Sequence, residues 1–196
     1  MKNKKRTFRL VVCAMFAALT VVMTVTPYFG YITYGGIIEI TTIHIAVIYA
    51  AAMLGPKDGA LIGGIWGITC LCRAFTLASP IAPLFYNPLI SVVPRILVGL
   101  VAGAVSALLF KKLKPKLKPV ALIITAVAGT LTNTVLVLGS IYLFGDTLSF
   151  YADLFELVKG IFSTIIGING IIELTAAVIL VPTLYKATER FFKDKL

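Results

Sequence analysis

Apolar segments of about twenty residues recur along almost the whole chain and constrain its fold more than any other feature. A helix needs about 20 apolar residues to cross the roughly 30 Å hydrocarbon core of a bilayer. The strands of a membrane barrel would instead read as segments of about ten alternating residues, so we expect no strands. The pattern predicts an all-α integral membrane protein, a single membrane domain over 1–196, with six transmembrane helices at about 8–26, 36–54, 59–77, 88–110, 119–144 and 160–185.

The composition agrees with a membrane protein, because 59% of the 196 residues are hydrophobic and only 13% are charged. A soluble domain of this length needs a more strongly charged surface. The formal net charge of +10 would suggest nucleic acid as the partner of a soluble protein. Here the cations form short clusters between apolar segments, so we expect the lipid bilayer, and no nucleic acid, as the partner of this charge.

The basic residues lie in alternate connections of the six-span arrangement. Clusters of Lys and Arg precede the first span, join the fourth to the fifth and follow the sixth, and Lys57 joins the second to the third. The opposite connections carry Lys159 as their only cation. Because cytoplasmic connections carry the excess of Lys and Arg, both termini are predicted to be cytoplasmic. The basic-then-apolar start resembles a signal peptide, but without a convincing cleavage site we expect it to stay as the first span.

Ionisable and amide side chains inside the predicted spans are few. Such residues are functional candidates by default, because they are costly to bury in lipid. Five of them fall in the outer halves of their spans: Glu39, His44, Arg73, Arg95 and Asn169. The other two, Asn133 and Glu173, lie near mid-depth. We interpret this asymmetry as a polar pocket that opens to the outside and is closed below.

Arg95 is the sharpest candidate for binding a ligand, since its planar fork of donors suits a carboxylate or a phosphate. Pro94 precedes it and is expected to loosen the helix. Trp66 is a candidate for stacking against a ligand. The outer connection before the fourth span contributes Tyr86 and Asn87, in a segment whose complexity is typical of binding loops.

Each of these residues also has a purely structural interpretation. Arg95 would pair with Glu173 to hold two helices together, and Arg73 would reach the outer headgroups. His44 would bond a neighbouring carbonyl, and Trp66 would serve packing. The two asparagines, Asn133 and Asn169, would join helices by hydrogen bonds. The outer aromatic residues would anchor the chain at the membrane interface.

The sequence lacks the motifs of the common membrane-associated enzymes. It contains no Walker A motif, no GxSxG or HExxH motif and no Asp-rich phosphotransferase motif. We therefore predict no catalytic residue, no metal ligand and no enzymatic activity. An integral-membrane enzyme built on Glu173, His44 and Arg95 is the alternative from another class.

Several stretches together resemble the substrate-binding S-components of energy-coupling factor (ECF) vitamin transporters, over almost the whole chain. They are Ala14-Met-Phe-Ala-Ala18, Thr42-Ile-His-Ile45, Leu54-Gly-Pro-Lys-Asp-Gly-Ala60, Val93-Pro-Arg-Ile-Leu-Val-Gly99 and Gly129-Thr-Leu-Thr-Asn-Thr134. The resemblance implies a bacterial plasma-membrane protein that binds one vitamin near its outer face. It also implies docking, through Ala14 and Ala18, on a transmembrane T-component that carries two ATPase subunits. Those subunits hydrolyse ATP, so the resemblance implies no cofactor for this chain.

The substrate implied by the resemblance is pantothenate. The stretches around His44 and Arg95 look closest to the pantothenate branch, with Arg95 for the carboxylate and Asn133, Asn169 and His44 for the hydroxyl and amide groups. Riboflavin members tend to carry an Asp-Phe-Ser-Asp-like stretch where this chain reads Glu39-Ile-Thr-Thr-Ile-His44, which counts against riboflavin. Folate, pyridoxal-type vitamins and queuosine precursors stay open.

Overall fold

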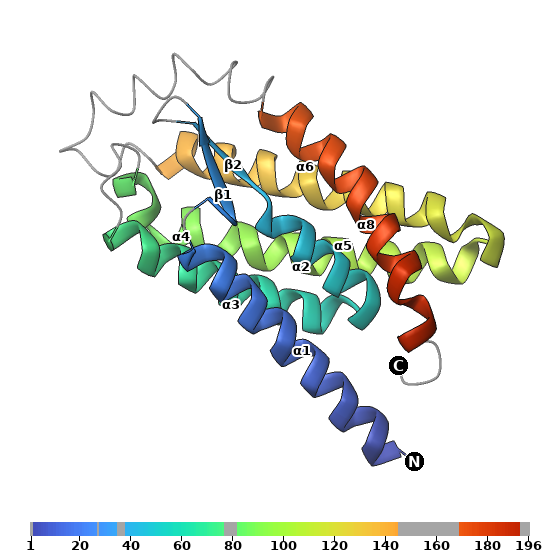
Figure 1. Cartoon of the computed structure of the whole chain (residues 1–196). Helices are drawn as coiled ribbons and strands as arrows, with labels where there is room; N and C mark the ends of the chain where they lie inside the picture. Colours follow the sequence, from blue (N-terminus) through green and yellow to red (C-terminus); the bar gives the residue numbers. More distant parts are fainter. Residues whose placement is uncertain (1, 27, 35–37, 77–81, 145–168, 193–196) are drawn as a thin grey trace.

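The computed structural model describes all residues except 1, 27, 35–37, 77–81, 145–168 and 193–196 (Figure 1). The described part is mainly helical. It contains five helices that are long and apolar enough to cross a membrane. They are formed by α1 (Lys2–Val25), α3 (Pro56–Thr76), α4 with α5 (Pro88–Ser91 and Val93–Lys112), α6 (Lys118–Phe144) and α8 (Gly170–Phe192). The chain is therefore a multi-pass membrane protein.

The predicted second span differs most from the structure. Residues Tyr31–Tyr34 (β1) and Ile38–Thr41 (β2) form an antiparallel hairpin with Tyr31 opposite Thr41, and helix α2 covers only Ile43–Leu54. The prediction of a helix from residue 36, and of no strands, was wrong. A 12-residue helix is only about 18 Å long. Nearly all of α2 is buried, which makes it the central helix of the bundle.

The other boundaries agree more closely. Helix α1 starts at Lys2 instead of residue 8, and α3 and α6 match their predicted spans to within a few residues. Helix α8 continues to Phe192, beyond the predicted end at 185, whereas residues 160–168 of the sixth span lie outside the described residues. Residues 145–159, which join the predicted fifth and sixth spans, also lie outside the described residues.

The predicted fourth span is interrupted close to Pro94. A short 3₁₀ helix, Ala82–Tyr86, leads into α4, and α5 begins after a break at Val92. Proline has no N–H and its ring crowds the carbonyl four residues earlier, which here belongs to Ile90. The expectation that Pro94 loosens the helix is thus confirmed.

Glycines bring α3 and α5 into close contact. A Cβ atom added to Gly63 would lie 2.1 Å from the Arg95 carbonyl oxygen, and one added to Gly59 would lie 2.5 Å from the Gly99 oxygen. Real Cβ atoms do not approach so closely, so a larger residue at Gly63 would push α5 away. These small residues therefore serve internal packing between α3 and α5, and the close approach places Arg95 directly beside α3.

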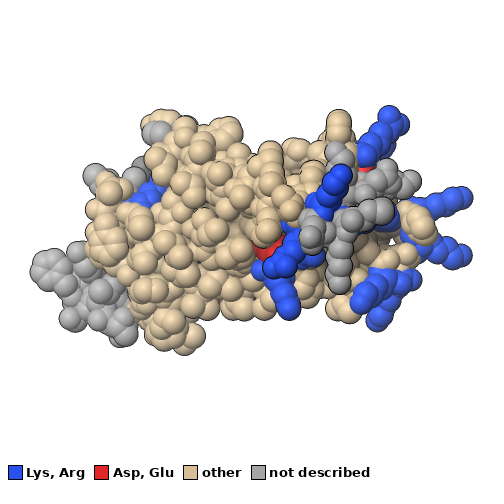
Figure 2. Space-filling model, turned by 90° about the horizontal axis from the view of Figure 1, so that it is seen from below, with Lys and Arg blue, Asp and Glu red and all other residues tan. Residues whose placement is uncertain are grey.

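The two ends of the molecule differ in charge. Lys and Arg gather over one end of the surface in Figure 2, and the middle carries few of them. The start of α1 and the end of α8 lie at one end of the bundle, whereas the β1–β2 hairpin lies at the opposite end (Figure 1). The basic segments at 4–9, 111–118 and 186–190 lie at the end where α1 begins and α8 ends (Figure 1).

Candidate functional site

Six of the predicted site residues are buried beneath the hairpin, and they come from five different helices. They are His44 of α2, Trp66 of α3, Arg95 of α5, Asn133 of α6, and Asn169 and Glu173 at the start of α8. Asn169 itself lies just before Gly170, the first residue of α8. A polar cluster drawn from five helices is an unusual use of a membrane interior, where such groups are costly.

Arg95 is oriented by the break in its own helix. Because Pro94 has no N–H, the Ile90 carbonyl lacks its helical donor, and Arg95 Nη1 donates to that carbonyl at 2.7 Å. The guanidinium lies 5.2 Å from the Trp66 ring centroid and 5.5 Å from that of Phe85. Both distances are typical of cation–π contacts. The helix break at Pro94 thus orients the Arg95 guanidinium, which lies within cation–π distance of two aromatic rings.

No carboxylate is in contact with Arg95 among the described residues. The three ion pairs of this part of the chain do not include it, and its Nε has no hydrogen-bond partner there. Glu173 interacts with Arg95 only electrostatically, at longer range. The structural interpretation in which Arg95 pairs directly with Glu173 is wrong. Arg95 is only 4% exposed, so it is a buried cation with free capacity for an anion.

Residues of α8 hold the second strand of the hairpin. The Glu173 carboxylate accepts a hydrogen bond from the Thr41 N–H at 2.6 Å, and Asn169 Nδ2 donates to the Glu39 carbonyl at 3.2 Å. The Oδ1 atom of Asn169 has no partner in the part of the chain that the structure describes. Asn169 thus joins the start of α8 to strand β2 instead of joining two helices, and one of its acceptors has no described partner.

His44 and Asn133 lie at the same depth. Gly129 of α6 packs against Ile48 of α2, and these two helices run in opposite directions. One turn towards the hairpin leads from Ile48 to His44 and from Gly129 to Asn133. His44 is fully buried, and its ring interacts with the neighbouring Thr41 backbone, but neither ring nitrogen reaches hydrogen-bond geometry with a described residue. The Asn133 Oδ1 atom likewise lacks a described partner. These unpaired groups are suited to a polar ligand.

Tyr31 completes the cluster, and sequence reasoning missed it. Its hydroxyl accepts a hydrogen bond from Trp66 Nε1 at 3.3 Å and lies 3.2 Å from Cys70 Sγ. Burial raises the pKa of Tyr31 well above its usual value, so the hydroxyl stays protonated. The only signal in the sequence was the abundance of Tyr and Gly between residues 27 and 35.

Arg73 ties the hairpin to the outer end of α3. Its guanidinium donates to both Glu39 carboxylate oxygens, at 3.0 and 3.2 Å, and lies 4.1 Å from the Tyr31 ring centroid. The side chain is partly buried, and its guanidinium is bonded to the hairpin. Arg73 therefore contacts both strands that cover the cluster.

Tyr86 and Asn87 have local contacts outside the cluster. The Tyr86 ring stacks on Phe75 at a centroid distance of 4.4 Å, and Asn87 Oδ1 accepts from the Leu89 N–H to cap α4. Both residues are partly exposed, and no hydrogen bond among the described residues joins either of them to the buried cluster. The structure thus gives both residues structural contacts at the rim.

Ala14 and Ala18 lie far from the cluster, on a different surface. Both are exposed on α1, together with apolar neighbours such as Val11, Met15 and Val22. An exposed helix face with small residues four positions apart allows another helix to approach closely. Within the described residues, this face is left uncovered.

The long apolar helices and the hairpin enclose a buried polar cluster, the arrangement of a multi-pass membrane protein with a candidate binding site in its interior. The chain belongs to the family of substrate-specific components of ECF transporters, because the family model matches residues 8–185. The resemblance seen in the sequence motifs is thereby confirmed at the level of the family, which makes this chain a component of a transporter.

Two relatives are similar to the chain in sequence. One is the "Pantothenate transporter PanT" of Leuconostoc mesenteroides subsp. mesenteroides, 39% identical over 107 residues, which cover 53% of this chain and 52% of that protein. The other is the "Pantothenic acid transporter PanT" of Lactococcus lactis subsp. cremoris, 31% identical over 204 residues, which cover 94% of this chain and 97% of that protein. The match thus spans about half of the first relative and nearly all of the second.

Proposed function

We propose that the chain binds pantothenate from the outer side of a bacterial plasma membrane and presents it to an ECF transporter for uptake. The observation that carries this proposal is Arg95, a buried guanidinium with no contacting carboxylate among the described residues. A ligand carboxylate would supply the missing partner through two parallel hydrogen bonds. The printed names of the two similar proteins support pantothenate as the ligand.

The other groups of the cluster suit the remainder of pantothenate. The molecule carries two hydroxyl groups and an amide N–H, which are hydrogen-bond donors. The unpaired Oδ1 atoms of Asn133 and Asn169 are acceptors, and His44 offers one donor and one acceptor. Trp66 would pack against the apolar carbons. In this account Glu173 and Arg73 hold the hairpin over the site, and Tyr86 and Asn87 shape its rim.

The proposed topology has six crossings with both termini in the cytoplasm. The five long helices need one further crossing to bring both ends to one side, and the short helix α2 supplies it. The concentration of Lys and Arg at the end with both termini supports a cytoplasmic location for that end. The hairpin and the cluster beneath it then face outward.

We further propose that the chain docks on a transmembrane T-component carrying two ATPase subunits. The exposed small-residue face at Ala14 and Ala18 is the proposed contact. The partners would hydrolyse ATP, so this chain would need no cofactor and would catalyse no reaction itself. Its bound solute should then leave chemically unchanged.

Native mass spectrometry of the detergent-purified chain, incubated with an equimolar mixture of vitamins, tests the proposal. The mixture should contain pantothenate, riboflavin, folate and pyridoxal. We expect one pantothenate bound to each chain, with the unmodified mass. Selection of another vitamin would overturn the substrate but keep the class, whereas a chemically altered ligand would favour the membrane enzyme.

A further inference from the structure

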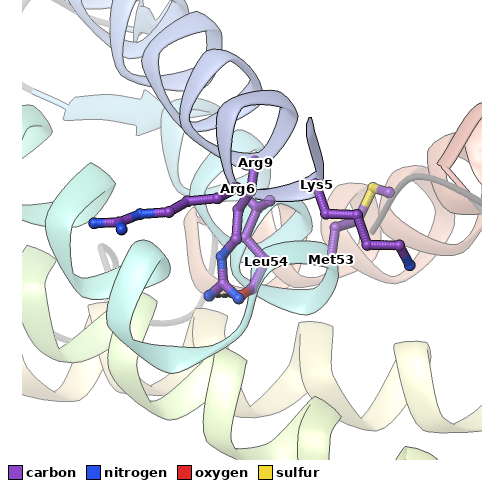
Figure 3. A pocket seen from close by; sticks show the side chains of 5 residues that line it. All are labelled: Lys5, Arg6, Arg9, Met53 and Leu54. Carbon is purple, nitrogen blue, oxygen red and sulfur yellow. Dashed lines mark hydrogen bonds between the residues drawn. The ribbon is translucent and has the colours of Figure 1, made fainter. Parts of the chain in front are cut away.

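Arg9 joins three helices at the basic end of the molecule. Its Nε donates to the Asp58 carboxylate in the first turn of α3, and its Nη2 donates to the Leu54 carbonyl at the end of α2, at 2.6 Å. Figure 3 shows the Arg9 side chain reaching from α1 to this carbonyl at the floor of a cavity of about 350 Å³. The cavity is also lined by Lys5, Arg6 and Met53.

The bond to Leu54 supplies a donor to a carbonyl that has none within its own helix. The last carbonyls of a helix have no intrahelical donor, and a cation near them is favourable. Leu54 is the last residue of α2, and Asp58 lies at the start of α3, so Arg9 bridges the turn between the two helices from outside. The contact therefore has a defined geometry, unlike simple apolar packing.

Arg9 lies on the side of α1 opposite to Ala14 and Ala18. Each residue turns a helix by about 100°, so Ala14 is about 140° and Ala18 about 180° away from Arg9 around the axis. The Arg9 guanidinium reaches from α1 to Asp58 and Leu54, with its side chain 49% accessible, whereas both alanines lie on the opposite, exposed face. Any rotation of α1 about its axis would change both the Arg9 contact and the direction in which the alanines face.

The other inward residues of α1 make apolar and aromatic contacts. The Phe16 ring meets that of Tyr49 of α2 edge to face at 5.4 Å, and the Phe8 ring lies 5.8 Å from that of Phe192 of α8. Val12 and Cys13 are buried and pack through apolar contacts, which have little directionality. The hydroxyls of Thr20 and Thr24 bond carbonyls of their own helix, Ala17 and Thr20 respectively. Arg9 adds to these contacts two hydrogen bonds from α1 to its neighbouring helices, which set both distance and direction.

We infer that Arg9 is a positioning residue for docking: its bonds to Asp58 and Leu54 fix the rotation of α1 so that the Ala14–Ala18 face points outward to the partner. This inference rests on the proposed docking function. The ion pair is largely exposed, with side chains 49% and 23% accessible, so it adds little to stability and its variants should fold.

The test compares Arg9→Gln with Arg6→Gln in full transporter complexes. Both variants remove one positive charge from the same cavity, but Arg6 extends away from Leu54 (Figure 3). We expect Arg9→Gln to lower the amount of chain recovered with a tagged T-component by roughly threefold to tenfold. Arg6→Gln should leave recovery unchanged, and both variants should melt close to the wild-type temperature.

Charge reversal provides a second test. Arg9→Asp should reduce assembly, and adding Asp58→Arg should restore part of it, because the reversed pair can form again. Equal assembly of the single and double variants would contradict the inference.

A comparison with Ala14→Trp combined with Ala18→Trp separates the two proposals. If the Trp variants prevent assembly and Arg9→Gln does not, the role of Arg9 is overturned while the docking face stands. If the Trp variants assemble normally, the docking face is wrong and the role of Arg9 falls with it. A melting temperature lowered strongly by Arg9→Gln alone would assign Arg9 to folding and overturn the inference.

Discussion

Glu39 of β2 and Arg73 of α3 are joined by two hydrogen bonds, of 3.0 and 3.2 Å, between carboxylate and guanidinium. The same guanidinium lies 4.1 Å from the ring centroid of Tyr31 on β1. One arginine therefore attaches both strands of the hairpin to the outer end of α3. Because the hairpin covers the polar cluster, this attachment should affect how long a ligand stays bound.

Arg73→Gln is expected to increase the dissociation rate of pantothenate by roughly fivefold, since a partly exposed ion pair contributes about 1 kcal/mol. The association rate should change little. Trp66 is the only tryptophan of the chain and lies in the cluster, so its fluorescence in stopped-flow experiments reports on binding directly. Arg73→Lys keeps the positive charge but not the forked guanidinium, so its dissociation rate should lie between those of the wild type and Arg73→Gln. An unchanged dissociation rate in Arg73→Gln would show that the ion pair does not hold the hairpin closed.

Gly63→Ala is expected to weaken pantothenate binding although Gly63 is not a proposed ligand contact. The added Cβ would lie 2.1 Å from the Arg95 carbonyl oxygen, so α5 and Arg95 must shift. Overpacking of this kind costs about 1–3 kcal/mol of stability. Gly64→Ala is the matched control, because its Cβ would come no closer than 3.4 Å to the flexible Ile96 side chain. Titration calorimetry and thermal melting should separate the two variants, and equal effects would contradict the packing argument.

His44→Leu is expected to leave the empty protein as stable as wild type or more stable, while binding weakens. The His44 ring makes no well-formed hydrogen bond to a described residue, and burying a poorly bonded polar group costs about 1–3 kcal/mol, which the substitution removes. Ser106→Ala is the control, since the Ser106 hydroxyl donates to the Ala52 carbonyl at 3.2 Å and its loss should lower stability without changing affinity. Loss of stability in His44→Leu would show that the imidazole is structural.

Ala14→Trp combined with Ala18→Trp is expected to prevent assembly with the T-component, because bulky side chains block close helix approach. Binding of pantothenate by the chain alone should be retained, since these residues lie on the exposed face of α1. Leu61→Trp, on the exposed face of α3, controls for a large aromatic group at a lipid-facing position. Co-purification and calorimetry measure the two properties, and assembly of the double variant would rule out this face.

Hydropathy predicted most of the helices but not the hairpin. Helices α3 and α6 lie within a few residues of their predicted spans, because a long apolar segment has no other stable form inside a bilayer. The segment 36–54 is equally apolar, yet it contains strand β2 and a short helix. Average hydropathy does not distinguish such a pair from one helix, and the β-branched alternation from Ile38 to Thr41 was the missed signal.

The membership of the polar cluster was largely predictable, but its bonding was not. Residue type and depth indicated Arg95, His44 and Glu173, which the structure brings beneath one hairpin. Which groups bond depends on side-chain direction: Arg95 donates to the carbonyl that Pro94 leaves free, and Glu173 accepts from β2. No spacing rule gives such contacts, and Tyr31 was missed because the hairpin itself was not predicted.

The central claim is that Arg95 binds the carboxylate of pantothenate, and calorimetric titration with pantothenate and with its alcohol analogue pantothenol tests it most directly. Pantothenol carries a hydroxymethyl group in place of the carboxylate. Wild-type protein should bind pantothenate more tightly by about 2–5 kcal/mol, and Arg95→Gln should lose both this affinity and the preference for the acid. Equal binding of acid and alcohol by the wild type, or an unchanged preference in Arg95→Gln, would contradict the account.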